Sequence, residues 1–402
     1  MQQITYQTEV EVNKAFKNLI DCQSSTPFLL TPKLHEIENK ELILYGAGNM
    51  GVAAINWLKG CNVKIKFLVD ANEQKRATFI NGVQVILPTD ISEHDKDSCI
   101  FVVCVVTMPF YDIYSFLQKI GCKTIYPAWD IINLFNTNSK ILCGFSLSSI
   151  TESESNDCSK LFSLLSDTVS RAHYFQALSW RILKQEVLID YAPVLRENKY
   201  FPTDIPFSFL EDEIFVDCGA YDGVTIKSFL ARTGGVFKKI YAFEPSSEGF
   251  SSLLDFTSKA ELAGKVEIFN LGLGDIDGEG FFVDHLGDES HFTGQKCMVV
   301  KKRSKLDTAL KQVPFTYLKI HVEGDELEVV QGGLNVIREQ RPVIAVTIFH
   351  NKKDFLQIPK LLQLHLDDYS FYLRAYCYAG IETILYAFPN ERIHMKADTE
   401  ND

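Results

Sequence analysis

The stretch that most constrains the fold is a short apolar run followed by an acid and two glycines, IFVDCGAYDG at residues 214–223. Its apolar start is typical of a parallel strand buried on both faces, and Asp217 marks the predicted end of that strand. Gly219 and Gly223 have no Cβ, so one allows a tight turn and the other lets a ligand lie against bare backbone. Residues 224–229 can then begin a helix whose free N–H groups face an electron-rich ligand.

Three later stretches continue the pattern of a strand that ends in a polar turn. KIYAFEP (239–245) predicts a second strand ending at Glu244, a carboxylate able to accept hydrogen bonds from both hydroxyls of a ribose. VEIFNLGLGD (266–275) predicts a third strand, and LKIHVEGDELEVVQG (318–332) a fourth that runs into a helix. Residues 343–349 are predicted as a fifth strand, and 369–378 and 382–388 as the last two. The alternation predicts an α/β sheet with its ligand at the carboxyl ends of the strands.

The order VDxGAxxG, FEP, NxxLGD and LKIxVEGxExxVxxG is similar to the FkbM family of methyltransferases, over about residues 158–390. The resemblance implies an α/β fold with a class I methyltransferase Rossmann-like sheet and S-adenosyl-L-methionine as cofactor. Many members of the family O-methylate sugars. The acceptor that this resemblance implies is therefore a sugar hydroxyl of a polysaccharide, glycolipid or nucleotide-linked precursor.

The implied cofactor site has three parts. Asp217 orders the glycine turn and approaches the methionyl part of the cofactor. The loop itself is formed by Gly219, Ala220, Tyr221 and Gly223. Glu244 is the ribose clamp, and Leu273 and Asp275 bracket the adenine; for Asp275, an ordinary turn residue in GDIDGEG is an equal alternative.

The predicted catalytic residues also stand at strand ends. His321 departs from the family's usual LKIDVEG and supplies a group that titrates near neutrality, so it is either a general base or the mark of weakened activity. Glu323 is a second candidate base, with helix capping as its alternative, and His350 is predicted to face the acceptor or to be structural. Lys319 is expected to point its charge outward. Because no HxH, HExxH or DxD pattern is present, no metal is predicted.

A second glycine-rich turn lies near the start of the chain. Residues 42–45 predict a strand, GAGNMG (46–51) fits GxGxxG, and a second strand at 64–69 ends at Asp70. Gly46, Gly48, Gly51 and Asp70 are therefore candidate nucleotide-binding residues. The unit has only about 95 residues, whereas a complete dinucleotide fold needs two βαβαβ halves. Binding of a nucleotide or nucleotide sugar and a degenerate domain kept for packing or assembly are both compatible with the pattern.

The predicted organisation of the 402 residues has five parts. They are an N-terminal helix and extension (1–38), a smaller Rossmann-like α/β domain (39–136), a linker (137–157), the FkbM-type domain (158–396) and a tail (397–402). The first part is an appendage or a helix of a homodimer. Residues 158–191 are predicted to be helical, and Tyr200 and Phe201 to form a hydrophobic plug or to line a substrate face.

Composition narrows the class of partner. A net charge of −12 disfavours a nucleic-acid partner, and ten cysteines without CxxC pairing favour a reducing compartment. The start of the chain lacks a signal-peptide pattern, and the longest apolar run, residues 99–106, is too short to span a membrane. The prediction is a cytoplasmic O-methyltransferase with a small-molecule or glycan acceptor. The alternative is a non-catalytic protein that binds the cofactor or a nucleotide sugar through a degenerate site.

Overall fold

The computed structural model describes residues 3–21, 34–38, 40–135, 147, 150–258, 262, 264–284, 291–293 and 299–393. They divide into two compact units. The N-terminal unit lies within 1–150, 172–195 and 375–381, and the C-terminal unit within 151–171, 196–374 and 382–402. This division differs from the predicted domain boundaries. Residues 172–195 and 375–381, which were predicted as parts of the FkbM-type domain, belong to the N-terminal unit. The predicted tail and most of the predicted linker lie outside the described residues.

The C-terminal unit is built on a seven-stranded sheet, in the order β11-β10-β9-β16-β17-β19-β18. Its strands are β9 (Ile214–Cys218), β10 (Lys239–Phe243), β11 (Val266–Phe269), β16 (Tyr317–Ile320), β17 (Val343–Thr347), β18 (Tyr369–Ala375) and β19 (Thr383–Pro389). The pairs from β11 to β17 are parallel, and β19 runs antiparallel to β17. The predicted α/β class with a class I methyltransferase sheet is confirmed. The carboxyl ends of β9, β10 and β16 therefore meet at one edge.

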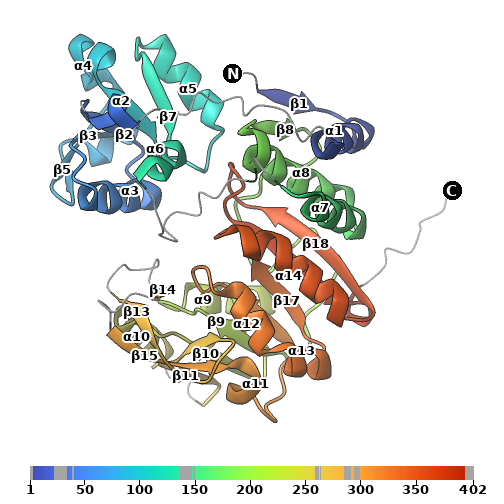
Figure 1. Cartoon of the computed structure of the whole chain (residues 1–402). Helices are drawn as coiled ribbons and strands as arrows, with labels where there is room; N and C mark the ends of the chain where they lie inside the picture. The colour runs from blue at the N-terminus through green and yellow to red at the C-terminus, as the bar shows by residue number, and fades with distance from the viewer. Residues whose placement is uncertain are drawn as a thin grey trace. The chain divides into compact units, whose positions relative to one another are not determined.

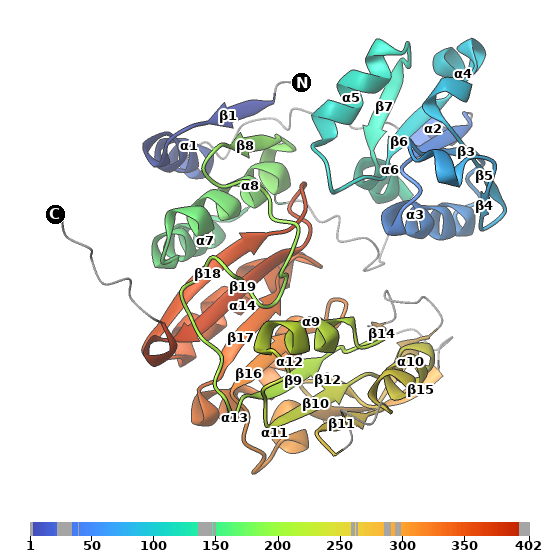
Figure 2. The same ribbon diagram turned by 180° about the vertical axis from the view of Figure 1, so that it is seen from behind.

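Helices cover both faces of this sheet. They are α7 (Glu152–Leu164), α9 (Val224–Thr233), α10 (Ser247–Thr257), α11 (Leu306–Ala309), α12 (Glu326–Gly332), α13 (Leu334–Gln340) and α14 (Lys352–His365). Figure 1 shows α12, α13 and α14 in front of the strands, and Figure 2, seen from behind, shows α9 and α10 in front of them. Because both faces are covered, every residue of β9, β16 and β17 is buried, which explains their continuous apolar sequences.

A second, four-stranded sheet follows β11 and was not predicted. Its order is β12-β15-β13-β14, with β12 (Gly272–Gly274), β13 (Gly278–Val283), β14 (His291–Thr293) and β15 (Val299–Lys305). Glycines and lysines interrupt the period-2 apolar pattern by which strands are recognised in a sequence. A Cβ on Gly274 would lie 2.1 Å from the Arg303 guanidinium, so β12 depends on a glycine where β15 packs against it.

The predicted helix over 158–191 is interrupted. The structure has α7, then α8 (Thr168–Leu183), and then the strand β8 (Val187–Ile189). Between the helices, Leu165 forms a parallel bridge with Phe371, and the Ser166 N–H donates to the Phe371 carbonyl at 2.8 Å. Tertiary pairing with β18 therefore overrides the helical periodicity at this point.

The N-terminal unit contains a six-stranded sheet, in the order β4-β5-β3-β2-β6-β7. Its strands are β2 (Leu42–Tyr45), β3 (Ile65–Val69), β4 (Phe79–Ile80), β5 (Val83–Ile86), β6 (Ile100–Val103) and β7 (Thr124–Pro127). Its helices are α2 (Leu34–Glu38), α3 (Asn49–Gly60), α4 (Glu93–Ser98), α5 (Phe110–Lys119) and α6 (Ala128–Phe135). The unit also holds α1 (Glu9–Asp21) and a parallel pair of β1 (Ile4–Tyr6) with β8. Within the described residues, no helix combines the length and apolar character that crossing a bilayer requires.

Candidate active site

A cavity of about 520 Å³ opens where β9, β10 and β16 end in the C-terminal unit. That volume lies in the range of small-molecule sites. Residues from all four sequence motifs stand on its wall: Gly219, Ala220, Tyr221, Glu244, Leu273, His321 and Glu323. Of the other residues predicted for this site, Asp217, Gly223, Asp275 and His350 do not line it. The fold therefore brings most of the predicted residues to one hollow.

Glu244 is held rigidly at this wall. Its carboxylate accepts hydrogen bonds from the N–H groups of Tyr221 (2.8 Å, at Oε2) and Ser246 (2.7 Å, at Oε1). Burial raises the pKa of Glu244, and the bonds from Ser246 and Tyr221 oppose that rise. A carboxylate has about four acceptor positions, so two fixed donors leave capacity for a ligand's hydroxyls.

The place of Glu244 depends on Gly249, which the sequence analysis did not single out. A Cβ on Gly249 would lie 2.6 Å from Ser246 Oγ, 2.8 Å from Tyr221 Cδ2 and 3.1 Å from the Glu244 carboxyl carbon. Gly249 stands in the first turn of α10, where the Ser246 hydroxyl accepts from its N–H. Two of the atoms it makes room for belong to residues just before α10, and only that of Tyr221 comes from another strand end.

The loop glycines serve the protein's own packing. Gly219 has φ 84°, and a Cβ there would lie 1.8 Å from the His321 carbonyl oxygen. A Cβ on Gly223 would lie 2.7 Å from the Phe256 ring of α10, so this glycine makes room for a side chain of the protein itself. Tyr221 is a non-glycine residue with φ 47°, a conformation that costs on the order of 1–3 kcal/mol. This strain points its N–H at Glu244.

Asp217 and Lys319 form a buried ion pair behind the loop. The Lys319 Nζ lies 2.8 Å from Asp217 Oδ1 and donates to the carbonyl oxygens of Cys218 (3.2 Å) and Gly219 (2.6 Å). Burial raises the pKa of Asp217, and the charge of Lys319 counteracts it. The expectation that Lys319 points outward is wrong, because its charge ties the turn to β16. Asp217 thus acts on the loop through Lys319, which itself lines the cavity.

The two residues predicted to bracket an adenine have different places. Leu273 is buried and on the cavity wall. The Asp275 side chain is 45% exposed, lies 3.5 Å from the Arg303 guanidinium, and is off the wall. This placement favours the alternative that Asp275 is an ordinary turn residue.

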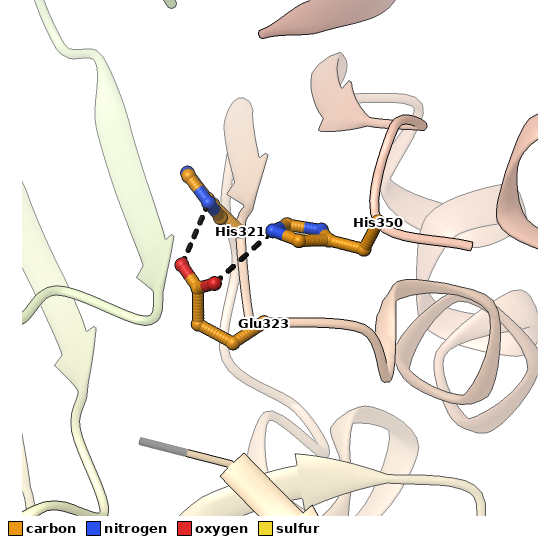
Figure 3. A group of neighbouring side chains, drawn as sticks. All are labelled: His321, Glu323 and His350. Atoms are coloured by element: carbon orange, nitrogen blue, oxygen red, sulfur yellow. Dashed lines mark ion pairs between the residues drawn. The ribbon is translucent and has the colours of Figure 1, made fainter. Parts of the chain in front are cut away.

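The three predicted catalytic residues form one cluster, although they come from two strands (Figure 3). Both imidazoles point at the carboxylate of Glu323: His321 Nε2 lies 2.8 Å from Oε1, and His350 Nε2 lies 3.1 Å from Oε2. Glu323 itself has φ 56°, a strained conformation for a residue with a side chain. Burial raises the pKa of Glu323, but the charges of His350 and His321 outweigh it, so that pKa falls well below its usual range.

The other ring nitrogen of each histidine also has a fixed partner. His321 Nδ1 lies 2.5 Å from the Tyr200 hydroxyl, whose pKa burial raises well above its usual value, so the phenol stays protonated. His350 Nδ1 lies 2.9 Å from Glu326 Oε1. Tyr200 and Phe201 both line the cavity, and Phe201 also packs among Phe215, Phe229 and Tyr317, as expected of a hydrophobic plug.

Glu326 fixes the position of the cluster by binding both His350 and the nearby backbone. Its carboxylate accepts from the N–H groups of Val322 (2.9 Å) and Gly324 (3.0 Å) and from the Thr347 hydroxyl (3.1 Å). Burial raises the pKa of Glu326, but the charge and hydrogen bond of His350 outweigh it and lower that pKa to about 2. The carboxylate that binds the backbone before α12 is thus Glu326, which leaves Glu323 without the capping role offered as its alternative.

In the glycine turn of the N-terminal unit, most of the predicted nucleotide-binding residues contact other groups of the protein. A Cβ on Gly46 would lie 2.6 Å from Val105, and one on Gly51 would lie 2.0 Å from the Gly46 carbonyl oxygen, whereas Gly48 faces open space. Asp70 accepts from the Ala47 N–H (2.9 Å) and pairs with Lys75 (3.2 Å). Nucleotide binding at this turn stays a prediction.

Residues 217–372 match the family model described as the methyltransferase FkbM domain. The fold is similar to the crystal structure of methyltransferase FkbM from Methylobacillus flagellatus KT, with a TM-score of 0.67 and 18% identity over 95% of this chain and 100% of that one. At this identity the likeness shows the fold alone.

The N-terminal region is similar to the redox-sensing transcriptional repressor Rex. The identity is 34% over 94 residues for Rex of Bacillus subtilis (strain 168), and 33% over 94 residues for Rex of Bacillus velezensis. The match covers 23% of this chain and 44% of each repressor, so the chain spans less than half the length of these relatives. Residues 217–372 of the chain thus match the FkbM family of methyltransferases, whereas the N-terminal region is similar to part of a different protein.

Proposed function

We propose that the chain transfers the methyl group of S-adenosylmethionine to a hydroxyl oxygen, on a sugar of a polysaccharide, glycolipid or nucleotide-linked precursor. The observation that carries this proposal is that Glu244 and the glycine loop share one cavity with His321 and Glu323. The carboxylate of Glu244, which can bind a ribose, and the pair of His321 and Glu323, which can take up a proton, therefore line the same cavity. The sugar comes from the family resemblance and is the finer part of the proposal.

The residues present fit this cofactor. Glu244 keeps free acceptor positions for the ribose hydroxyls, Leu273 offers an apolar surface to the adenine, and residues 219–221 border the methionyl part. When bound, the cofactor supplies an electrophilic methyl group on a sulfonium. The buried ion pair of Asp217 and Lys319 keeps the loop in place, and of these two residues only Lys319 lines the cavity.

At the acceptor end, the residues of the chain bind and orient a hydroxyl. A hydroxyl beside His321 and Glu323 meets an imidazole and a carboxylate that is ionised at neutral pH. The Glu323 carboxylate can accept its proton as the oxygen attacks, whereas both nitrogens of His321 already have partners. The Tyr200 hydroxyl holds His321 in one orientation, which reduces the entropy lost in reaching an aligned arrangement.

The test is binding and turnover by the full-length protein. S-adenosylhomocysteine is titrated calorimetrically into wild type and Glu244→Gln, and methyl transfer is followed with a panel of sugar acceptors. Loss of one charge-assisted hydrogen bond corresponds to roughly 10- to 100-fold weaker binding. Wild-type affinity in Glu244→Gln would refute the assignment of the ribose clamp. Binding of S-adenosylhomocysteine with no methyl transfer to any of the acceptors would favour the non-catalytic alternative.

A further inference from the structure

We infer that His321, Glu323 and His350 form a binding site for a divalent transition-metal ion of the zinc or cobalt type. No contiguous sequence pattern predicts a metal here, because these ligands come from the separate ends of β16 and β17. The donor atoms all lie within 4.8 Å of one another. Figure 3 shows both imidazoles directed at the same carboxylate.

The present spacing is close to that of a coordination sphere. Zinc bonds of about 2.0–2.1 Å place neighbouring tetrahedral ligands roughly 3.3 Å apart. The Nε2 atoms of His321 and His350 lie 2.8 and 3.1 Å from the two Glu323 oxygens. Small rotations of the three side chains would bring these donor atoms to the spacing of a tetrahedral site.

The surroundings also match those of a metal site. A metal-ligating histidine usually has its second nitrogen held by a carboxylate or another fixed group, which sets the ring orientation and the tautomer. Here the Nδ1 of His350 is held by Glu326 at 2.9 Å, and that of His321 by Tyr200 at 2.5 Å. Glu323 and Glu326 together offset the charge of a divalent ion.

The donor set decides the class of ion. Two imidazoles and one carboxylate suit Zn²⁺, Co²⁺ or Fe²⁺, whereas Mg²⁺ and Ca²⁺ prefer oxygen alone. The imidazole of His321 adds a nitrogen donor, which moves the set away from magnesium. His321 and Glu323 line the cavity, so an open coordination position would face it.

A second group of neighbouring side chains is less suited to binding a metal ion. It consists of Glu326, His350 and Asp354, all of them buried. The Glu326 oxygens already accept from two N–H groups and a hydroxyl. Asp354 accepts from the Asn351 N–H₂ group (2.5 Å) and more weakly from the Leu327 N–H (3.4 Å). Internal donors thus occupy both carboxylates, and this second group supports the first.

Metal binding stands independently of the proposed function, but the role of the ion rests on it. An ion here would bind the acceptor oxygen and lower the pKa of its hydroxyl, which favours the alkoxide before methyl transfer. In the metal-bound form the three ligands would act through the ion, in place of the proton uptake described for the metal-free site, and the proton released from the hydroxyl would pass to solvent water.

The experiment uses untagged full-length protein that has been stripped with a chelator, without cofactor or acceptor. Co²⁺ is titrated and followed by its visible absorption, and Zn²⁺ and Mg²⁺ are added as competitors. The variants are His321→Asn and Glu323→Gln. The matched control is His94→Gln, an exposed histidine of α4 in the N-terminal unit. Circular dichroism and thermal unfolding check that each variant folds.

We expect about one Co²⁺ per chain in wild type and His94→Gln, displaced by Zn²⁺ and not by Mg²⁺. His321→Asn and Glu323→Gln should bind at least about 100-fold more weakly. Equal binding by wild type and the two site variants, or no stoichiometric binding by wild type, would show a metal-free hydrogen-bonded cluster and overturn the inference. Glu244→Gln, which alters the nucleoside side, should retain the metal, so failure of the proposed function is separable from failure of this inference.

Discussion

Gly249→Ala tests whether the position of Glu244 decides cofactor binding. The new methyl group would lie 2.6 Å from Ser246 Oγ, 2.8 Å from the Tyr221 ring and 3.1 Å from the Glu244 carboxyl carbon. All three contacts are shorter than ordinary van der Waals distances, so Glu244 or Tyr221 must move. Either movement disturbs the hydrogen bond of 2.8 Å that joins them.

The expected effect on stability is small, because two contributions oppose each other. Alanine is favoured over glycine in a helix by about 1 kcal/mol. Overpacking costs about 1–3 kcal/mol. The net loss of unfolding free energy should therefore be roughly 0–2 kcal/mol. The protein should stay folded at room temperature.

The expected effect on binding is larger. Displacement of the Glu244 carboxylate removes a charge-assisted hydrogen bond to the ribose, so S-adenosylhomocysteine should bind roughly 10- to 100-fold more weakly. The assay is calorimetric titration, with stability measured in parallel by urea unfolding.

Gly60→Ala is the matched control, because it ends the helix α3 and a Cβ there would meet nothing within 4 Å. It should keep wild-type binding and stability or gain slightly. If Gly249→Ala binds S-adenosylhomocysteine as wild type does, either Glu244 does not hold the ribose or the site absorbs the methyl group, and the reasoning is refuted.

Two further predictions concern the buried Arg374. Its buried guanidinium lies 2.7 Å from Asp167 and 2.6 Å from Asp204, whose side chains are 31% and 39% exposed, so Arg374→Met should lower the urea unfolding free energy by about 1.5–3 kcal/mol. Arg76→Met, which removes an exposed pair with Asp90, should cost less than about 1 kcal/mol, and equal losses would contradict the argument. Burial raises the pKa of Asp167, but the hydrogen bond and charge of Arg374 outweigh it and lower the pKa below 3.8. The folded carboxyl therefore ionises more readily than the unfolded one, so this stabilisation is present above that value and lost as the pH falls through the folded pKa. Asp167→Asn should make the unfolding free energy fall less steeply as the pH is lowered. If the unfolding free energy, measured with urea at several acidic pH values, falls as steeply as in wild type, the prediction is refuted.

Much of the C-terminal fold was predictable because its signals are local. Residues 214–216 are apolar without interruption because β9 is buried on both faces, and the same holds for β16 and β17. The second sheet was not predictable, because its glycines and lysines conceal the strand pattern. The helix over 158–191 was overpredicted, because a bridge to β18 breaks it at Leu165.

The site divides in the same way. Each strand-end residue is recognisable from its own motif, and Glu244, Leu273, His321 and Glu323 do line the cavity. Their partners are not recognisable, because they lie far away in the sequence. Tyr200 reaches His321 from 121 residues away, and Lys319 reaches the Gly219 carbonyl from 100 residues away.

The amino-acid sequence alone determined the class of fold, the glycine turn and the strand ends that carry polar groups. These depend on apolar runs and backbone freedom within a few residues. Only the tertiary structure decided that Gly223 makes room for Phe256, that Lys319 turns inward, and that His350 meets Glu323. Side-chain direction and pairing depend on which strand ends become neighbours, and parallel strands joined by helices bring together residues that no local pattern connects.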